Sequence, residues 1–140
     1  MKILIAEDEF TIGRMFQVML EGSGHTVTLT SDGEQCVEAY KHATIQSSNR
    51  SEEYLAEHPP FDVVLMDGRM PIMDGVQAAK QILHINQQQR IIFITAYMRN
   101  TIETSLKDFS RPLEIISKPV DLDVLVAIVE GGNKTLVSPQ

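Results

Sequence analysis

The chain has 140 residues and a formal net charge of −7, and its 43% hydrophobic and 22% charged shares are typical of a globular protein. This length gives one domain a proper core and is too short for two domains of ordinary size. The basic residues are scattered, which argues against direct nucleic-acid binding, because a phosphate backbone requires clustered Lys and Arg. A single cysteine, no bilayer-length apolar stretch and no signal peptide predict a cytoplasmic protein without a membrane segment.

The first half of the chain alternates strand and helix patterns. A nearly continuous apolar run at 2–6 predicts a strand covered on both faces, and residues 25–30 alternate like an edge strand. Apolar residues at helical spacing predict helices over 11–21 and 33–46. The connection 42–60 is long for an α-to-β link, so a partner-binding loop and a tolerated surface insertion remain equal alternatives.

The second half of the chain continues the alternation. Its predicted elements are a strand at 62–66, a helix at 75–86, a strand at 90–96, a helix at 99–108, a strand at 113–117 and a helix at 121–130. Asp74 is placed to cap the helix that begins at Gly75. Residues 132–140 carry no periodic pattern and are expected to form a flexible C-terminal tail.

Five successive strand–helix pairs predict an α/β fold with a parallel sheet between two layers of helices and right-handed crossovers. In open sheets of this kind, ligands bind beyond the carboxyl ends of the strands, where the strand order reverses. Functional side chains are therefore expected at the points where the apolar runs end.

Five polar side chains stand at those points. Glu7 and Asp8 follow the first strand, Asp67 the third, Thr95 ends the fourth, and Lys118 follows the fifth. Two carboxylates about 4 Å apart repel by roughly 4 kcal/mol at an effective dielectric near 20, so the three acids need a cationic partner. Mg²⁺ suits carboxylate, water and phosphate ligands, and the set therefore predicts phosphoryl chemistry with Asp67 as the nucleophile.

Four blocks of the sequence resemble the signature of response-regulator receiver domains. They are "AEDE" at 6–9, "LMDGRMPIMDG" at 65–75, "ITA" at 94–96 and "SKP" at 117–119. They occur in the family's order across about 1–131, which would be the receiver domain. The resemblance implies a doubly wound, flavodoxin-like (βα)5 fold with strand order 2-1-3-4-5.

The resemblance also implies a role for the acids. Asp67 would accept a phosphoryl group from the phosphohistidine of a sensor histidine kinase or of a phosphorelay histidine domain. Asp8 and Asp67 would bind Mg²⁺ directly, Glu7 would act through water, and the backbone carbonyl of Arg69 would complete the metal shell.

Two further residues would hold the phosphoryl oxygens, namely Thr95 and Lys118, and the Lys118–Pro119 bond is often cis in such domains. The resemblance implies a stand-alone phosphoacceptor that catalyses its own phosphorylation and dephosphorylation and is no conventional enzyme. Its output would be binding to a downstream target protein, as a monomer or as a phosphorylation-dependent dimer.

One residue departs from the family pattern, because Ile115 occupies the position three before the lysine where these domains carry Tyr or Phe. The usual coupling of the threonine to an aromatic ring is therefore in doubt. The main alternative is an interaction module that signals without phosphorylation. An aspartyl phosphatase fits poorly because Arg69 stands where its acid/base carboxylate would be, and a flavodoxin-like cofactor binder fits poorly because "EDEF" at 7–10 would repel phosphate.

Overall fold

The computed structural model describes residues 1–46, 51, 54, 57–68, 70, 73–96, 109, 113–131 and 136–137. The expected helix at 99–108, the expected ligand Arg69 and the centre of the 42–60 connection lie outside these described residues. Among the described residues, no helix is both long enough and apolar enough to cross a bilayer.

The strands form one sheet in the order β2-β1-β3-β4-β5-β6, in which β1 to β5 run parallel. Their bounds are β1 Lys2–Ala6, β2 Thr26–Thr30, β3 Val63–Asp67, β4 Ile91–Thr95, β5 Leu113–Ser117 and β6 Leu136–Val137. The predicted strand order 2-1-3-4-5 is confirmed. It reverses between β1 and β3, which is where an open sheet of this kind binds its ligands.

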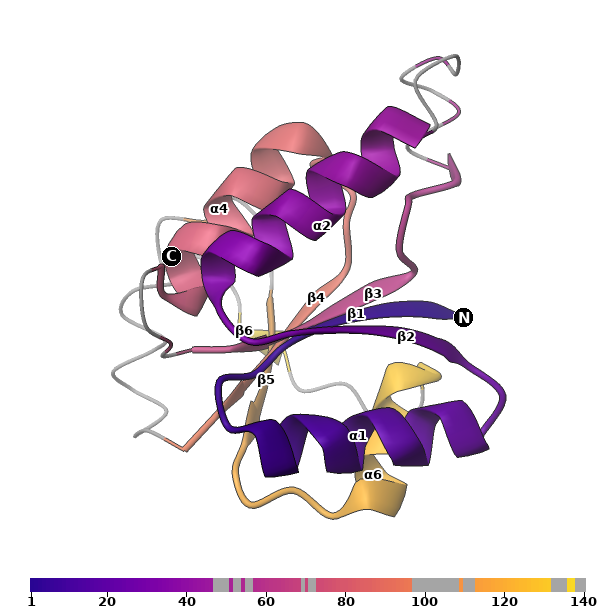
Figure 1. The fold of residues 1–140 in the computed structure, drawn as a ribbon, viewed down its shortest axis with the longest axis vertical. Coiled ribbons are helices and arrows are strands. Elements are labelled where there is room, and N and C mark those ends of the chain that lie inside the picture. Colours follow the sequence, from indigo (N-terminus) through magenta and orange to yellow (C-terminus); the bar gives the residue numbers. More distant parts are fainter. Residues whose placement is uncertain are drawn as a thin grey trace.

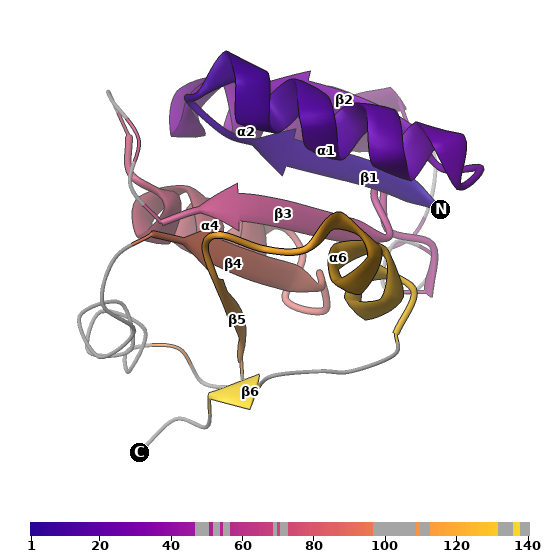
Figure 2. The same ribbon diagram turned by 90° about the horizontal axis from the view of Figure 1, so that it is seen from below.

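Helices cover both faces of the sheet, with α2 and α4 on one side and α1 and α6 on the other (Figure 1). Their bounds are α1 Phe10–Gly22, α2 Gly33–Gln46, α4 Gly75–Ile85 and α6 Leu122–Val129. The turned view in Figure 2 looks onto the sheet from the side of α1 and α6 and shows the strands side by side, with β6 at the far edge from β2. The predicted helices at 11–21, 33–46, 75–86 and 121–130 therefore end within two residues of the observed ones.

The apolar strands are buried on both faces because their side chains alternate between two cores. In β1, Leu4 and Ala6 belong to the core under α2 and α4, whereas Ile3 and Ile5 belong to the core under α1 and α6. Every residue of β3 and β4 is buried. This double burial explains the continuous apolar runs of β1, β3 and β4, in which the next polar residue marks the carboxyl end of the strand.

Three of the described helices begin at carboxylate caps. The side chain of Asp74 accepts a hydrogen bond from the backbone N–H of Gln77 at 2.8 Å, and Asp121 accepts one from Asp123 at 2.9 Å. Asp32, just before α2, accepts one from the backbone N–H of Gln35 at 2.8 Å. Each carboxylate satisfies a helix N–H that has no partner within the helix. The predicted capping role of Asp74 is confirmed.

Two residues of the segment 132–140, for which the sequence predicts a flexible tail, lie in a strand. Leu136–Val137 form β6, which pairs antiparallel with Leu113 and Glu114 at the edge of β5. No local pattern predicts this strand, because two residues show no periodicity and the pairing depends on the edge of β5, more than 20 residues earlier.

Arg90 joins three elements at the amino end of the sheet. Its guanidinium makes two hydrogen bonds of 2.8 Å to the carboxylate of Glu114 in β5. It also donates to the carbonyls of Ile128 and Val129 at 2.7 and 2.6 Å, which caps the end of α6. Because the Glu114 side chain is only 7% exposed, this arginine takes the place of the water that would otherwise surround its carboxylate.

Replacing Arg90 with alanine leaves a buried carboxylate and two helix carbonyls without their donor. We expect the free energy of unfolding to fall by about 3 kcal/mol, measured by chemical denaturation. The matched control is Arg14→Ala, which removes an exposed arginine whose hydrogen bond, within the part of the chain that the structure describes, goes to Gln17 on the same helix. If Arg90→Ala lowered the free energy of unfolding by no more than Arg14→Ala does, the stabilising role of Arg90 between β5 and α6 would be contradicted.

Cys36 lies in α2 with no exposed surface, and burial raises the pKa of its thiol to about 12. A hydrogen bond with Thr30 opposes this rise in pKa, and the charge of Asp32 adds to it. The thiol is therefore protonated at neutral pH. Its contribution to stability is complete below its ordinary pKa of 9.0 and is lost as the pH rises above that value.

The native protein should consequently resist a thiol reagent such as DTNB at pH 8, because neither the thiolate nor access is available. The same protein in guanidinium should react at once and provides the internal control. Rapid reaction of one thiol equivalent under native conditions would show that the burial of Cys36 is not maintained in solution.

Candidate functional site

The polar residues picked out by the sequence meet at the carboxyl edge of the sheet. Asp67 and Thr95 are the last residues of β3 and β4, and Glu7 and Lys118 each follow a strand by one residue. Because β1, β3, β4 and β5 are adjacent and parallel, their ends lie side by side. The strands alone therefore bring residues more than 100 positions apart into one site.

The acids form one cluster. A carboxylate oxygen from each of Glu7, Asp8 and Asp67 lies within 4.8 Å of the other two. Glu7 and Asp67 are buried, at 3% and 7% exposure, whereas Asp8 is exposed. Carboxylate oxygens are the ligands that hard divalent cations prefer, and an exposed member leaves an entry path for an ion. The donor set fits a magnesium ion.

Lys118 lies among these acids and supplies a positive charge. Its Nζ donates a hydrogen bond to Oε1 of Glu7 and lies 3.6 Å from Oδ2 of Asp67. The ammonium therefore pairs more closely with Glu7 than with Asp67. The sequence predicted the lysine in the site but not this choice of partner.

The pKa of Lys118 is raised above the ordinary lysine value of 10.5. Burial lowers it, but the hydrogen bond to Glu7 and the charge of Asp67 raise it by more. Further increases come from the charges of Glu7 and Glu9. The lysine consequently carries its positive charge throughout the neutral range.

Backbone contacts fix how Lys118 enters the site. Its N–H donates to the carbonyl of Thr95 at 2.7 Å, and the Lys118–Pro119 bond is cis, as the resemblance implied. Thr95 itself is fully buried and faces Ser117 across the β4–β5 ladder. These contacts hold the threonine and the lysine on neighbouring strands.

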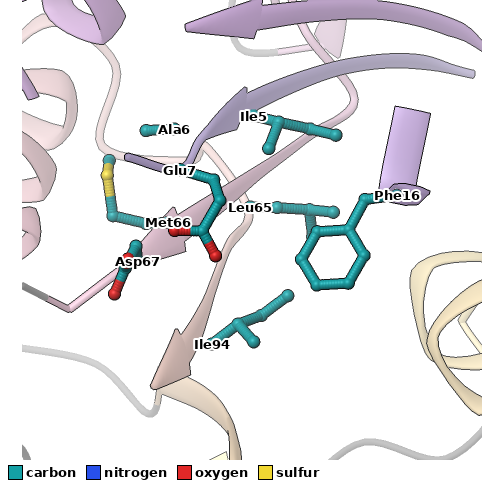
Figure 3. A pocket seen from close by; sticks show the side chains of 8 residues that line it. All are labelled: Ile5, Ala6, Glu7, Phe16, Leu65, Met66, Asp67 and Ile94. Carbon is teal, nitrogen blue, oxygen red and sulfur yellow. The ribbon is translucent and has the colours of Figure 1, made fainter. Parts of the chain in front are cut away.

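A small pocket lies behind the acids, lined by strand residues and one residue of α1 (Figure 3). In that view the Glu7 carboxylate lies between Asp67 and the apolar side chains of Leu65 and Phe16. The lining residues are Ile5, Ala6, Glu7, Phe16, Leu65, Met66, Asp67 and Ile94. This apolar wall limits hydration of the acids and strengthens every charge interaction at the site.

Gly75 allows α4 to begin close against the end of β3. A Cβ at this position would lie 2.0 Å from the carbonyl oxygen of Asp67 and 2.9 Å from Cγ of Met66. Its N–H also donates to the carbonyl of Gly68 at 3.3 Å. The sequence placed Gly75 in the "MDG" block but gave no sign that it supports the backbone of Asp67.

Ile115 is fully buried in the core under α2 and α4, opposite Phe93 in the β4–β5 ladder. Phe109 belongs to the same core. The position at which receiver domains usually carry an aromatic ring is therefore filled here by a buried aliphatic side chain.

Comparison with known proteins defines the class. The fold is that of CheY-like proteins: the structure of Vibrio cholerae CheY4 superposes with a TM-score of 0.72 over 92% of this chain and 95% of that one, at 21% identity. The family description "Response regulator receiver domain" matches residues 3–130. The chain belongs to the response regulator receiver domain family, which serves two-component signalling.

Relatives of two sizes match the chain. The chemotaxis protein CheY of Bacillus subtilis is 34% identical over 96% of this chain and 97% of its own length. Histidine kinase 1 of Arabidopsis thaliana is 29% identical over 91% of this chain, which spans only 12% of that protein. The chain likewise spans 25% of the Escherichia coli transcriptional regulatory protein ZraR. The domain therefore resembles both single-domain proteins and parts of larger ones.

A methyl group at position 75 should disturb the site through the backbone of Asp67. We expect Gly75→Ala to lower the free energy of unfolding by about 1–3 kcal/mol, the usual cost of overpacking, and to weaken magnesium binding. Chemical denaturation and a magnesium titration measure the two effects. Gly22→Ala is the matched control, because nothing lies within 4 Å of the added Cβ. If Gly75→Ala and Gly22→Ala had equal free energies of unfolding and equal magnesium affinities, the close packing of Gly75 against Asp67 would be refuted.

Proposed function

We propose that the chain takes a phosphoryl group onto Asp67 from a phosphohistidine, on a sensor histidine kinase or a phosphorelay histidine domain, in a magnesium-dependent reaction. The supporting observation is the cluster at the carboxyl ends of adjacent strands, in which three carboxylates and one lysine converge. A buried aspartate with both a cation-binding acid cluster and a fixed ammonium beside it suits phosphoryl transfer better than simple binding.

Each acid has a distinct part in this proposal. Asp8 and Asp67 would hold the magnesium ion directly, and Glu7 would act through water. By the family resemblance, the backbone carbonyl of Arg69, which lies outside the described residues, would be a further ligand. When bound, the ion neutralises the carboxylates and screens an incoming phosphoryl group from them. Asp67, buried at the end of β3, is presented at a fixed position for attack.

The transfer itself forms one bond and breaks another. A carboxylate oxygen of Asp67 attacks phosphorus, the P–N bond to the donor imidazole breaks, and that nitrogen keeps the electron pair. Lys118 and Thr95 hold the oxygens of the transferred group on neighbouring strands. Attack of water on the resulting acyl phosphate then returns the Asp67 carboxylate and releases inorganic phosphate. The chain thus catalyses its own phosphorylation and dephosphorylation.

The proposed output is phosphorylation-dependent binding to a downstream target protein, in the cytoplasm. Residues 1–131 form the receiver domain, and 132–140 are a tail apart from the short strand β6. A monomer and a phosphorylation-dependent dimer are both compatible with this output. The competing reading is a receiver-like module that binds its partner without phosphorylation.

Measurement of the intact mass distinguishes a phosphoacceptor from a module that binds without phosphorylation. Incubation with magnesium and acetyl phosphate should add one phosphoryl group to the protein, and Asp67→Asn should abolish the gain. Asp74→Asn is the matched control, because it makes the same change nearby and asparagine still caps α4. No mass gain in the unaltered protein, or an equal gain in Asp67→Asn, would overturn the proposal.

A further inference from the structure

We propose that Gly33, the first residue of α2, is a positioning residue for the magnesium site, because it holds in place the loop that joins β3 to α4. This inference rests on the proposed function and extends it to a helix that supplies none of the polar side chains of the site. Gly33 contacts neither the ion nor the transferred group. It acts through the backbone of Met73, which lies in that loop.

The start of α2 contacts the loop backbone to backbone. A Cβ at Gly33 would lie 2.3 Å from the carbonyl oxygen of Met73, 3.0 Å from its carbonyl carbon and 3.1 Å from its Cβ. A backbone carbonyl cannot turn aside as the end of a flexible side chain can. Any residue larger than glycine at position 33 therefore requires either the helix or the loop to move.

The start of α2 is anchored to the sheet beside the acids. The buried side chain of Asp32 accepts from the backbone N–H of Gln35 at 2.8 Å. Thr30, at the end of β2, donates its hydroxyl to the carbonyl of Ile5 at 2.7 Å, and its own carbonyl accepts from the backbone N–H of Glu7 at 3.0 Å. These bonds fix the first turn of α2 relative to β1, so an added methyl group displaces the loop.

Met73 is the point at which the loop meets both helices on this face of the sheet. Its side chain packs against the core under α2 and α4, and its Sδ accepts a hydrogen bond from the side-chain amide of Gln81 at 3.6 Å. The next residue, Asp74, caps α4. Gly75 then lies against the backbone of Asp67, which closes the loop. The position of Met73 therefore sets the path by which the chain leaves and returns to Asp67.

The contact, and not the backbone conformation, requires glycine at position 33. Positive φ angles occur at Gly24 and Gly131 among the described glycines, and not at Gly33. Alanine is a better helix former than glycine, so helix propensity alone predicts that Gly33→Ala stabilises α2. The contact predicts the opposite, because the methyl group collides with the loop. The substitution therefore separates the two effects by their sign.

A displaced loop reaches the metal site through its backbone. Asp67 lies at the start of the loop, and by the family resemblance the backbone carbonyl of Arg69, within the loop, would be a ligand. Magnesium requires near-ideal octahedral geometry, so a small displacement of its ligands weakens binding. The contact between Gly33 and Met73 therefore sets the magnesium affinity from outside the acid cluster.

The first test needs neither metal nor phosphodonor. In amide NMR spectra, Gly33→Ala should shift the signals of Gly68, Met73 and Gly75, which belong to the loop and its junction with α4. The matched control is Gly22→Ala, because nothing lies within 4 Å of the added Cβ, and it should leave these signals in place. Loop signals that Gly33→Ala does not move would overturn the contact.

The second test is a double-mutant cycle on magnesium affinity, measured by calorimetry on the folded protein, where a loss of stability alone leaves affinity unchanged. Gly33→Ala should weaken binding by about threefold to tenfold, and Gly22→Ala should not change it. Met73→Gly lets the loop backbone yield, so in that background Gly33→Ala should cost at least about twofold less. Equal losses in the two backgrounds, or no loss in either, would overturn the positioning role.

The measurements distinguish this inference from the proposed function. If the unaltered protein binds magnesium but takes no phosphoryl group, the proposed function fails, and the two tests still decide the role of Gly33. If the unaltered protein binds no magnesium, both fail. Normal phosphoryl uptake together with an unchanged magnesium affinity in Gly33→Ala would overturn the inference alone.

Amide spectra establish that each variant is folded. If Gly33→Ala does not fold, the double variant with Met73→Gly should fold, because its loop can yield to the added methyl group. A double variant that also fails to fold would overturn the contact as the cause.

Discussion

The structure depends on negative charges being held together at the carboxyl edge of the sheet. Glu7 and Asp67 are buried there, and each would destabilise the other without a cation. Lys118 supplies one positive charge in the resting protein, and the geometry leaves an exposed third acid, Asp8, toward solvent. The edge therefore combines a lysine that partners two of the acids with a set of carboxylates that fits a divalent ion.

The rest of the fold serves to keep this edge rigid. Continuous apolar strands fill both cores, so the strand ends cannot shift without disturbing the packing. Gly75 brings α4 against the backbone of Asp67, and Arg90 fastens β5 and α6 at the opposite end of the sheet. Rigid strands therefore present the acids, and Lys118 reaches them from the residue that follows β5.

Ile115 sets this chain apart from the usual pattern of its family. The side chain is fully buried beside Phe93, in a core that also contains Phe109. Because an aliphatic side chain has no polar tip, it cannot exchange between buried and exposed positions as a tyrosine ring does. Any change that begins at Thr95 must therefore pass to the surface by another route than an aromatic side chain at this position.

The sequence by itself determined the order of strands and helices over β1 to β5 and the five polar residues at the strand ends, whereas the strand order 2-1-3-4-5 was implied by the resemblance of its signature blocks. Runs such as 2–6 and 62–66 carry this information because double burial demands apolar residues, and a polar residue after such a run marks a strand end. Only the tertiary structure decided that Lys118 pairs with Glu7, that Gly75 abuts Asp67, and that Leu136–Val137 add a strand to β5. These contacts join distant residues through side-chain reach and backbone spacing, which no local pattern encodes.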